Sequence, residues 1–264
     1  MHIARYALDG CVHHGIIENE TTIARLQGSP LEGLNRSGAI DALAAVRLLA
    51  PLHRPRVFGL GYNYTAHSNE SGKAVPQLPV LFMKPSTTVI GPNESIVYPA
   101  EGQNIHFEGE LTVVIGTQAR HVSEANALDH VLGYTCGNDV SDRVLQRRES
   151  EFGCLLAGKG YDTFAPMGPV IATGLDPARL GILTRVNGTV RQDGNTSDLL
   201  FSVPAIISYL SKYMTLLPGD MIMTGTPAGV GPIQVGDTIE IEIEGIGILR
   251  NGVEAEDRRD TSHP

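Results

Sequence analysis

Residues 106–116 read HFEGELTVVIG, so that two acidic residues lead directly into an apolar stretch. If this stretch is a strand, its side chains alternate between two faces, and Glu108 and Glu110 share one of them. Leu111 and Val113 then lie on the opposite, buried face. Neighbouring carboxylates repel each other unless a cation lies between them, and Mg²⁺ and Mn²⁺ prefer carboxylate oxygens. The pattern therefore predicts either a divalent cation site or the solvated end of a strand.

Short apolar segments of the same kind recur along the chain, separated by glycines and prolines. The 264 residues include 30 Gly and 16 Pro without a repeating period, which indicates many turns and excludes a coiled coil or helical bundle. Residues 238–249 alternate Ile with Glu, as expected of a half-buried strand with one solvated face. The strongest helix signal starts at Ser202, a good N-cap, with Pro204 in the first turn. We expect a mainly β fold with peripheral helices, of the α+β class.

The first 50 or so residues differ from the rest. Residues 3–8 and 14–17 are strand-like, and the Ala- and Leu-rich segment 39–50, ended by Pro51, predicts a short helix. We therefore expect a small N-terminal appendage, a larger catalytic domain and a polar C-terminal tail. Their predicted bounds are residues 1–52, 53–252 and 253–264.

Charge and composition exclude several classes of partner. Twenty Lys and Arg against 29 Asp and Glu give a formal net charge of −9, which argues against binding to a nucleic-acid backbone. The sequence shows neither a signal peptide nor an apolar run long enough to span a membrane. Cys11, Cys136 and Cys154 follow no disulfide or metal spacing, so we expect reduced thiols and a cytoplasmic location.

A second polar segment, residues 133–146, reads GYTCGNDVSDRVLQ. If a helix begins near Asp139, then Asp139, Arg143 and Gln146 lie on one stripe of it. Asp139 could equally be a helix cap, because the helix dipole favours an acid there. Asp142 and Arg147 fall off the stripe and are expected to be surface charges.

A third segment, residues 60–72, reads LGYNYTAHSNESG. His67 and Glu70 stand one helical turn apart, so that the carboxylate can orient the imidazole and raise its basicity. The following residues have the composition of a mobile connection. The pair predicts a general base on a closing segment, although a single histidine in such a place is often only a surface residue.

Two further segments are rich in glycine. Residues 158–169, GKGYDTFAPMGP, put Lys159 between two glycines, where the backbone can approach a ligand closely. Residues 224–232, TGTPAGVGP, follow a short apolar strand and resemble an anion-binding turn. No P-loop, G-x-G-x-x-G or G-x-S-x-G motif is present, which argues against nucleotide cofactors and serine hydrolysis.

In their order along the chain these segments resemble the fumarylacetoacetate hydrolase family. The resemblance covers residues 55 to 252, and it implies a twisted mixed β-sandwich roll and, commonly, a homodimer. Gly109 is a departure, since many relatives have a larger residue between the two glutamates, and we expect a local packing change there. The matching segments are Phe58–His67, Lys84–Ser86, Glu108–Leu111, Asn138–Arg143, Lys159–Pro169 and Thr224–Gly231.

The resemblance also implies a set of site residues. One Mg²⁺ or Mn²⁺ per chain would be held by Glu108, Glu110 and Asp139. His67 and Glu70 would transfer protons, with Lys159 as a third catalytic residue that offsets negative charge. The residues implied in substrate binding are Tyr64, Arg143, Gln146, Gly225 and Thr226.

The expected reaction is hydrolytic cleavage of a C–C bond in a small 2,4-dioxo acid of the acylpyruvate or fumarylpyruvate type. His67 would activate water, and the leaving carbon would be a metal-bound enolate. The alternative is decarboxylation or isomerisation of an oxo-diacid or oxo-dienoate, of the oxaloacetate or 2-hydroxyhepta-2,4-diene-1,7-dioate type, in aromatic catabolism. A third hypothesis is a non-catalytic binder on the same scaffold. The expected partner is a small anionic oxo acid, with no nucleic acid and no membrane.

Overall fold

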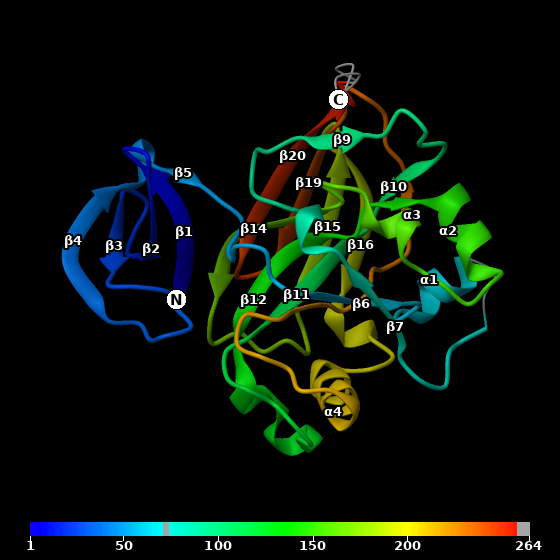
Figure 1. The fold of residues 1–264 in the computed structure, drawn as a ribbon, viewed down its shortest axis with the longest axis horizontal. Coiled ribbons are helices and arrows are strands. Elements are labelled where there is room, and N and C mark those ends of the chain that lie inside the picture. Colours follow the sequence, from blue (N-terminus) through cyan, green and yellow to red (C-terminus); the bar gives the residue numbers. More distant parts are fainter. Residues whose placement is uncertain (71–73, 258–264) are drawn as a thin grey trace, which may run out of the picture.

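The computed structural model describes residues 1–70 and 74–257, apart from the side chains of residues 67–69. A small N-terminal unit lies beside a larger β roll, and helices lie at the periphery of the roll (Figure 1). This arrangement confirms the predicted mainly β fold with an N-terminal appendage.

The N-terminal unit is built from antiparallel strands, with β5 added beside β1. The helix predicted over residues 39–50 is wrong, because β4, a 3₁₀ turn and β5 occupy this segment. Asp41 lies 8% exposed and binds Arg25 through both carboxylate oxygens at 2.7 and 2.9 Å. It also accepts a hydrogen bond from Tyr6 at 2.5 Å, so pairing with distant residues overrides the local helix propensity. The elements are β1 (His2–Leu8), β2 (Cys11–Ile17), β3 (Thr22–Leu26), β4 (Arg36–Ala42), the 3₁₀ turn Leu43–Ala45 and β5 (Arg47–Leu48).

The largest sheet runs from this unit into the roll. Strand β1 pairs with β14 through His2 and Ile3, and the sheet continues in the order β14-β12-β11-β17-β6-β7. Neighbours in this part are antiparallel except β17 and β6, which are parallel. Its strands are β14 (Ala165–Ala172), β12 (Val131–Asn138), β11 (Gly109–Ile115), β17 (Met221–Met223), β6 (Val57–Gly61) and β7 (Val80–Lys84), with β8 (Val89–Ile90) beside β14.

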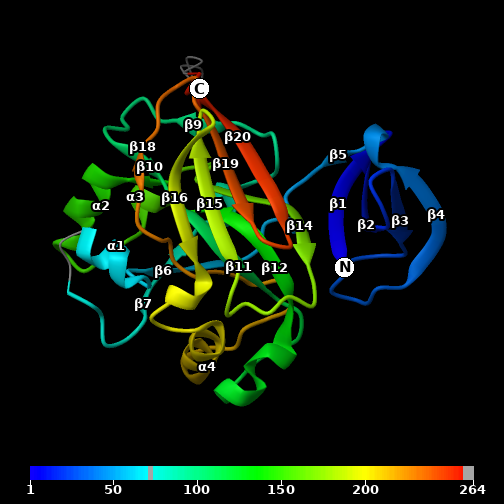
Figure 2. The same cartoon turned by 180° about the vertical axis from the view of Figure 1, so that it is seen from behind.

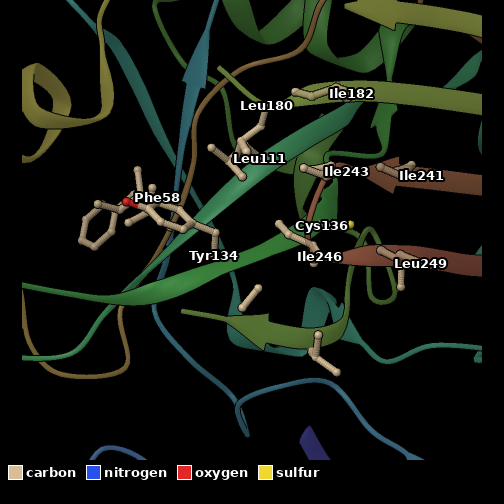
Figure 3. Packing of buried hydrophobic residues seen from close by; sticks show 14 of the residues in the cluster. Phe58, Leu111, Tyr134, Cys136, Leu180, Ile182, Ile241, Ile243, Ile246 and Leu249 are labelled. Atoms are coloured by element: carbon tan, nitrogen blue, oxygen red, sulfur yellow. The ribbon is translucent and has the colours of Figure 1, made fainter. Parts of the chain in front are cut away.

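A second sheet covers this one, and Figure 2 shows it from its outer side. The core lies between the two sheets, where Leu111 and Cys136 face Ile182, Ile241 and Leu249 (Figure 3). The predicted alternation is confirmed in β19, whose isoleucines are 1% exposed while its glutamates reach solvent. The single strand predicted over residues 238–249 is wrong beyond Ile243, because a turn at residues 244–246 leads into the antiparallel strand β20. The strands are β16 (Thr189–Asn195), β15 (Gly181–Val186), β19 (Thr238–Ile243), β20 (Gly247–Ala255) and β9 (Ile96–Tyr98), and a small third sheet holds β13 (Ser141–Asp142), β10 (Ile105–Phe107) and β18 (Gly231–Pro232).

The predicted boundaries are close to features of the structure. Strand β20 pairs with β9 as far as Ala255, so regular structure continues three residues into the predicted C-terminal tail. The connection between the N-terminal unit and the roll runs from Leu49 to Arg56, around the predicted boundary at residue 52.

Helices are short and lie outside the sheets. The helix predicted after Ser202 is α4, and the Ser202 hydroxyl caps it by accepting a hydrogen bond from the Ala205 N–H. None of the helices in the described part of the chain has the length and apolar character needed to cross a bilayer. They are α1 (Thr65–Glu70), α2 (Arg143–Ser150), α3 (Ala157–Gly160) and α4 (Val203–Tyr213), with 3₁₀ turns at Ser86–Thr88, Glu124–His130 and Thr196–Asp198.

Strand β11 is buried on both faces. Leu111 and Val113 pack in the main core, while Val114 lies with Met221 and Met223 in a second cluster. Glu110 lies at the start of this strand and is 1% exposed. The alternative of a solvated strand end is therefore excluded.

Gly109 is required by packing at the same strand end. A Cβ at this position would lie 2.2 Å from Thr184 Oγ1, which is itself buried and has no hydrogen-bond partner in the described part of the chain. We expect Gly109→Ala to lower the free energy of unfolding by about 1–3 kcal/mol, through overpacking. Adding Thr184→Ala should restore most of this loss, because it removes the clashing oxygen, whereas Thr184→Val should not. Chemical denaturation of the single and double variants measures the effect, and equal destabilisation in both doubles would refute the clash.

Candidate active site

Three carboxylates meet where β10, β11 and β12 end or begin. Glu108 joins β10 to β11, Glu110 is the second residue of β11, and Asp139 follows β12. The register of the two long strands puts Gly109 opposite Asn138, and the Asp139 N–H donates to the Glu108 carbonyl at 2.9 Å. One oxygen of each carboxylate lies within 4.8 Å of the others, and all three residues are buried. The structure thus brings together the three residues that the sequence predicted as metal ligands.

The route to this arrangement differs from the predicted one. No helix begins at Asp139: the chain first forms β13, and α2 starts at Arg143. Asp142 is its N-cap, accepting hydrogen bonds from the N–H groups of Val144 and Leu145 at 2.9 and 3.1 Å. Because it caps the helix from a position 2% exposed, its assignment as a surface charge was wrong.

Basic side chains surround the three carboxylates. Lys84 and Lys159 each place Nζ 2.5 Å from an oxygen of Asp139. Lys159 also donates to Glu108 at 3.0 Å, and Arg143 forms an ion pair with Glu108. Lys84 is buried at the end of β7. The sequence reasoning missed it as a site residue, although a lysine at the end of an apolar strand, just before a proline, is a signal of a buried charge. Such pairing is needed, because an uncompensated charge is costly to bury.

Glu110 is the least compensated member of the cluster. It accepts a hydrogen bond from the Gly225 N–H at 2.7 Å, and no basic side chain in the described part of the chain pairs with it. Burial raises the pKa of Glu110 well above its usual range, and the charges of Asp139 and Glu108 raise it further. A buried cluster of hard oxygen donors with an uncompensated negative charge fits a divalent cation such as Mg²⁺ or Mn²⁺.

The two lysines respond differently to burial. Burial lowers the pKa of Lys159, but Asp139 and Glu108 outweigh this effect, so its pKa is raised from the usual value. For Lys84 burial prevails over Asp139, and the pKa is lowered. Lys159 is therefore the firmly charged ammonium beside the carboxylates, and it also lies 4.7 Å from the centre of the Phe82 ring.

The glycine-rich segments serve to position other groups. A Cβ on Gly158 would lie 2.6 Å from the backbone nitrogen of Gln146. This glycine therefore lets α3 approach α2 closely, and the approach positions Lys159 in the site. Gly225 has a φ of +101° and packs against Asn63. This conformation directs the Gly225 N–H at Glu110. In both segments we expected the glycine backbone to approach a ligand closely. In the structure it approaches other parts of the protein instead.

Thr226 and Gln192 hold the backbone between the two glutamates. The Thr226 hydroxyl donates to the Gly109 carbonyl at 2.9 Å and accepts from the Gln192 side chain at 2.7 Å. Gln192 in turn accepts from the Gly109 N–H at 3.0 Å. Gln192 comes from β16 in the facing sheet, so only the folded structure identifies it as a positioning residue.

A cavity of about 370 Å³ opens onto the cluster. The predicted site residues in its wall are Glu70, Glu108, Glu110, Arg143, Gln146, Lys159 and Thr226. The other lining residues are Leu60, Gly61, Tyr62, Phe82, Asn104, His106, Arg147, Ser150, Leu155 and Val230.

Three predicted site residues lie outside the cavity wall, and a fourth is not described. Asp139, Gly225 and Tyr64 are buried and do not line the cavity, and burial raises the pKa of Tyr64. The His67 side chain lies outside the described residues. The carboxylate of Glu70 accepts from the Gly229 N–H at 3.2 Å, and its pairing with His67 stays a prediction.

Two cavity residues were missed by the sequence reasoning. Arg147 is solvent-exposed as predicted, yet it also lines the cavity one helical turn beyond Arg143, a spacing that could have revealed it. His106 places Nε2 3.2 Å from Asn104 Oδ1. Burial, followed by the charge of Arg143, lowers the pKa of His106 to about 4, so the imidazole is neutral at neutral pH.

A buried acidic cluster that fits a hard cation thus lies on a β roll, with basic groups beside it and a cavity opening onto both. Residues 56–254 match the family model described as fumarylacetoacetate (FAA) hydrolase C-terminal, and residues 1–51 match the model Rv2993c-like, N-terminal. The chain belongs to the fumarylacetoacetate hydrolase family.

Relatives in this family carry different activities in their names. The chain is 44% identical to a 5-carboxymethyl-2-hydroxymuconate delta-isomerase from Mycobacterium smegmatis, with a TM-score of 0.91 over 97% of this chain and 100% of that one. A fumarylacetoacetate hydrolase from Exiguobacterium antarcticum is 38% identical, with a TM-score of 0.86 and the same coverage. The human mitochondrial oxaloacetate tautomerase FAHD2A is 40% identical over 219 residues, which are 79% of this chain and 69% of that protein.

The charge state of Glu110 provides a test of the metal site. In EDTA, we expect Glu110→Gln to raise the free energy of unfolding by about 1–2 kcal/mol, because it removes the cost of burying an ionisable carboxyl beside two other acids and keeps an acceptor for the Gly225 N–H. Addition of Mn²⁺ at a hundred times its dissociation constant should stabilise the native sequence by about 2.7 kcal/mol and the variant far less. Thermal unfolding with and without Mn²⁺ measures both effects. Equal stabilisation of the two proteins would exclude Glu110 as a ligand.

Proposed function

We propose that this protein is a Mg²⁺- or Mn²⁺-dependent isomerase or tautomerase of a small oxo-diacid. The observation that carries the proposal is the buried cluster of Glu108, Glu110 and Asp139, placed at the floor of a cavity with basic groups in its wall. The named activities of the Mycobacterium smegmatis and human relatives support isomerisation rather than the hydrolysis expected from the sequence.

Charge balance supports a substrate with two carboxylates. The three acids of the cluster are formally matched by Lys84, Lys159 and Arg143. A bound divalent cation would leave two positive charges in a buried place. A dianionic oxo acid would neutralise them, whereas a monocarboxylate would leave one uncompensated.

The bound cation would act as a Lewis acid toward the oxygen atoms of the oxo acid. Lys159 Nζ, already oriented by Glu108 and Asp139, would offset negative charge that develops on the substrate. Glu70 lines the same cavity and, with His67, is the base proposed to take the proton from carbon. Leu60, Phe82, Leu155 and Val230 supply apolar surface in the same cavity, against which the carbon chain of a substrate could pack.

Arg143 and Arg147 are proposed to orient the substrate. Arg143 is tied to Glu108 and to Gln146 Oε1 at 2.9 Å, which fixes its guanidinium beside the cluster. Arg147 lines the cavity from the next turn of α2 and is solvent-exposed. It would pair with the second carboxylate, farther from the cluster.

Hydrolysis of a C–C bond is the second candidate. The Exiguobacterium antarcticum relative is named a hydrolase and shares the fold over 97% of this chain. Both reactions require an enolate, and they differ in whether water attacks carbon. The homodimer implied by the resemblance stays a prediction.

Product analysis tests the function. The protein would be incubated with Mn²⁺ and either oxaloacetate or an acylpyruvate, in ²H₂O and in H₂¹⁸O. Tautomerisation predicts faster keto–enol exchange and deuterium uptake at carbon with the skeleton intact, measured by NMR. Two fragments with ¹⁸O in a new carboxylate would indicate hydrolysis, and release of CO₂ would indicate decarboxylation. Turnover of neither substrate, or a rate unchanged by EDTA, would overturn the metal-dependent proposal.

Arg147 and Arg148 form a matched pair for the dicarboxylate prediction. Both are exposed arginines in the last turn of α2, but only Arg147 lines the cavity. We expect Arg147→Gln to raise the KM for an oxo-diacid by about three- to tenfold, with little effect on a monocarboxylate, because an exposed ion pair contributes modestly. Arg148→Gln should change neither KM. Steady-state kinetics on both substrates would contradict the assignment if the two variants behaved alike.

A further inference from the structure

Two cavities lie between the N-terminal unit and the roll, away from the proposed active site. Their volumes are about 420 and 380 Å³, and both are lined by Arg5, Leu52, His53 and Arg54. Neither shares a lining residue with the cavity above the acidic cluster. Their walls come from β1, from the connection between the two units, and, in the larger cavity, from the turn before β17.

The larger cavity has a surplus of basic groups. Arg5, Arg54, Arg56, His14 and His53 line it. Among its described lining residues the single acid is Asp220, and Arg56 already binds both of its carboxylate oxygens at 2.7 and 2.5 Å. Two arginines and two histidines therefore face this space without an acid in its wall to match them, in a protein whose formal net charge is −9.

Arg5 is held in place and partly desolvated. Its guanidinium donates to the Ala50 carbonyl at 3.3 Å, and burial lowers its pKa more than Glu94 raises it. His14 lies opposite Arg5 in the β1–β2 pairing, and burial together with the charge of Arg5 lowers the pKa of His14. Burial is the first cause of both pKa shifts, and it prevails over the opposing charges of Glu94 on Arg5 and of Glu32 on His14. An anion bound between the basic groups would offset this cost.

Arg54 adopts an unusual backbone conformation. Its φ is +48°, a left-handed value that is rare for a side chain of this kind and that clusters at ligand sites. The conformation turns the connection so that Arg54 lines both cavities. The side chain is exposed, so it can reach a ligand without losing a buried contact.

We propose that this junction binds a small dianion, such as a phosphate monoester or a short dicarboxylate, between Arg5 and Arg54. Guanidinium groups bind such anions through paired hydrogen bonds. The volume suits a small molecule, and the ligand would contact both the N-terminal unit and the roll. Because it would bridge the two units, its binding should stabilise their junction.

The test uses Arg54→Asn, since asparagine tolerates left-handed backbone and the substitution removes only the cation. Equilibrium dialysis would measure binding of inorganic phosphate and of succinate in EDTA, at constant ionic strength. The matched control is Arg179→Asn, because Arg179 is a surface arginine 81% exposed on the roll. We expect saturable binding to the native protein, at least tenfold weaker binding to Arg54→Asn, and unchanged binding to Arg179→Asn.

Competition between the two probes distinguishes the sources of the dianion. If phosphate and succinate displace each other in a manner abolished by Arg54→Asn, the junction takes either. If only one binds, that chemistry is assigned. The melting temperature and the turnover of Arg54→Asn should match or exceed those of the native protein, since Arg54 lies outside the active site. Binding that is absent, or that is the same in Arg54→Asn, would overturn the proposal.

Discussion

The burial of three carboxylates at one end of β11 is the constraint on which the rest of the site depends. Ionised groups cannot be removed from water without opposite charges and hydrogen bonds nearby. Lys84 arrives from β7, Lys159 from α3 and Arg143 from α2, so three separate elements have to dock before Glu108 and Asp139 are compensated. Glu110 has no basic partner among the described residues, which is why the cluster suits a cation better than a purely structural network.

Docking so many elements around one strand end limits the size of the residues between them. Gly109 has no room for a Cβ beside Thr184, and Gly158 allows α3 to touch α2. Gly225 takes a left-handed conformation that directs its N–H at Glu110. Part of the high glycine content of the chain is therefore a consequence of the buried acids, since their partners must come close from several directions at once.

Local patterns predicted what depends on neighbours in the chain. The alternation in β19 and the Ser202-capped helix both follow from periodicity and capping. Asp41 and Gln192 owe their roles to partners on other strands, so no local pattern could assign them. The local pattern around Lys84 marks it as unusual, but its partner Asp139 is 55 residues away. The motif resemblance supplied the link between Glu108 and Asp139. Local spacing, in contrast, started the helix at Asp139, whereas α2 begins at Arg143. Asp142 shows the same limit, because its role as a cap depends on where that helix really begins.

The choice between isomerisation and hydrolysis depends on the wall of the cavity rather than on the acidic cluster. Both reactions would use the same cation and the same basic groups. In both, negative charge that develops on carbon is delocalised onto the oxygen of an enolate. Hydrolysis additionally requires a water molecule held against a carbonyl carbon, and so a polar pocket beside it. The wall of this cavity holds both kinds of side chain. Leu60, Phe82, Leu155 and Val230 offer water no hydrogen bond, whereas Tyr62, Asn104 and His106 carry groups that can bind it. The polar groups Arg147 and Ser150 belong to α2, where they suit a carboxylate of the substrate. The two reactions therefore differ in whether one of these polar side chains holds a water molecule against a carbonyl carbon, and the proposed isomerisation requires that none of them does.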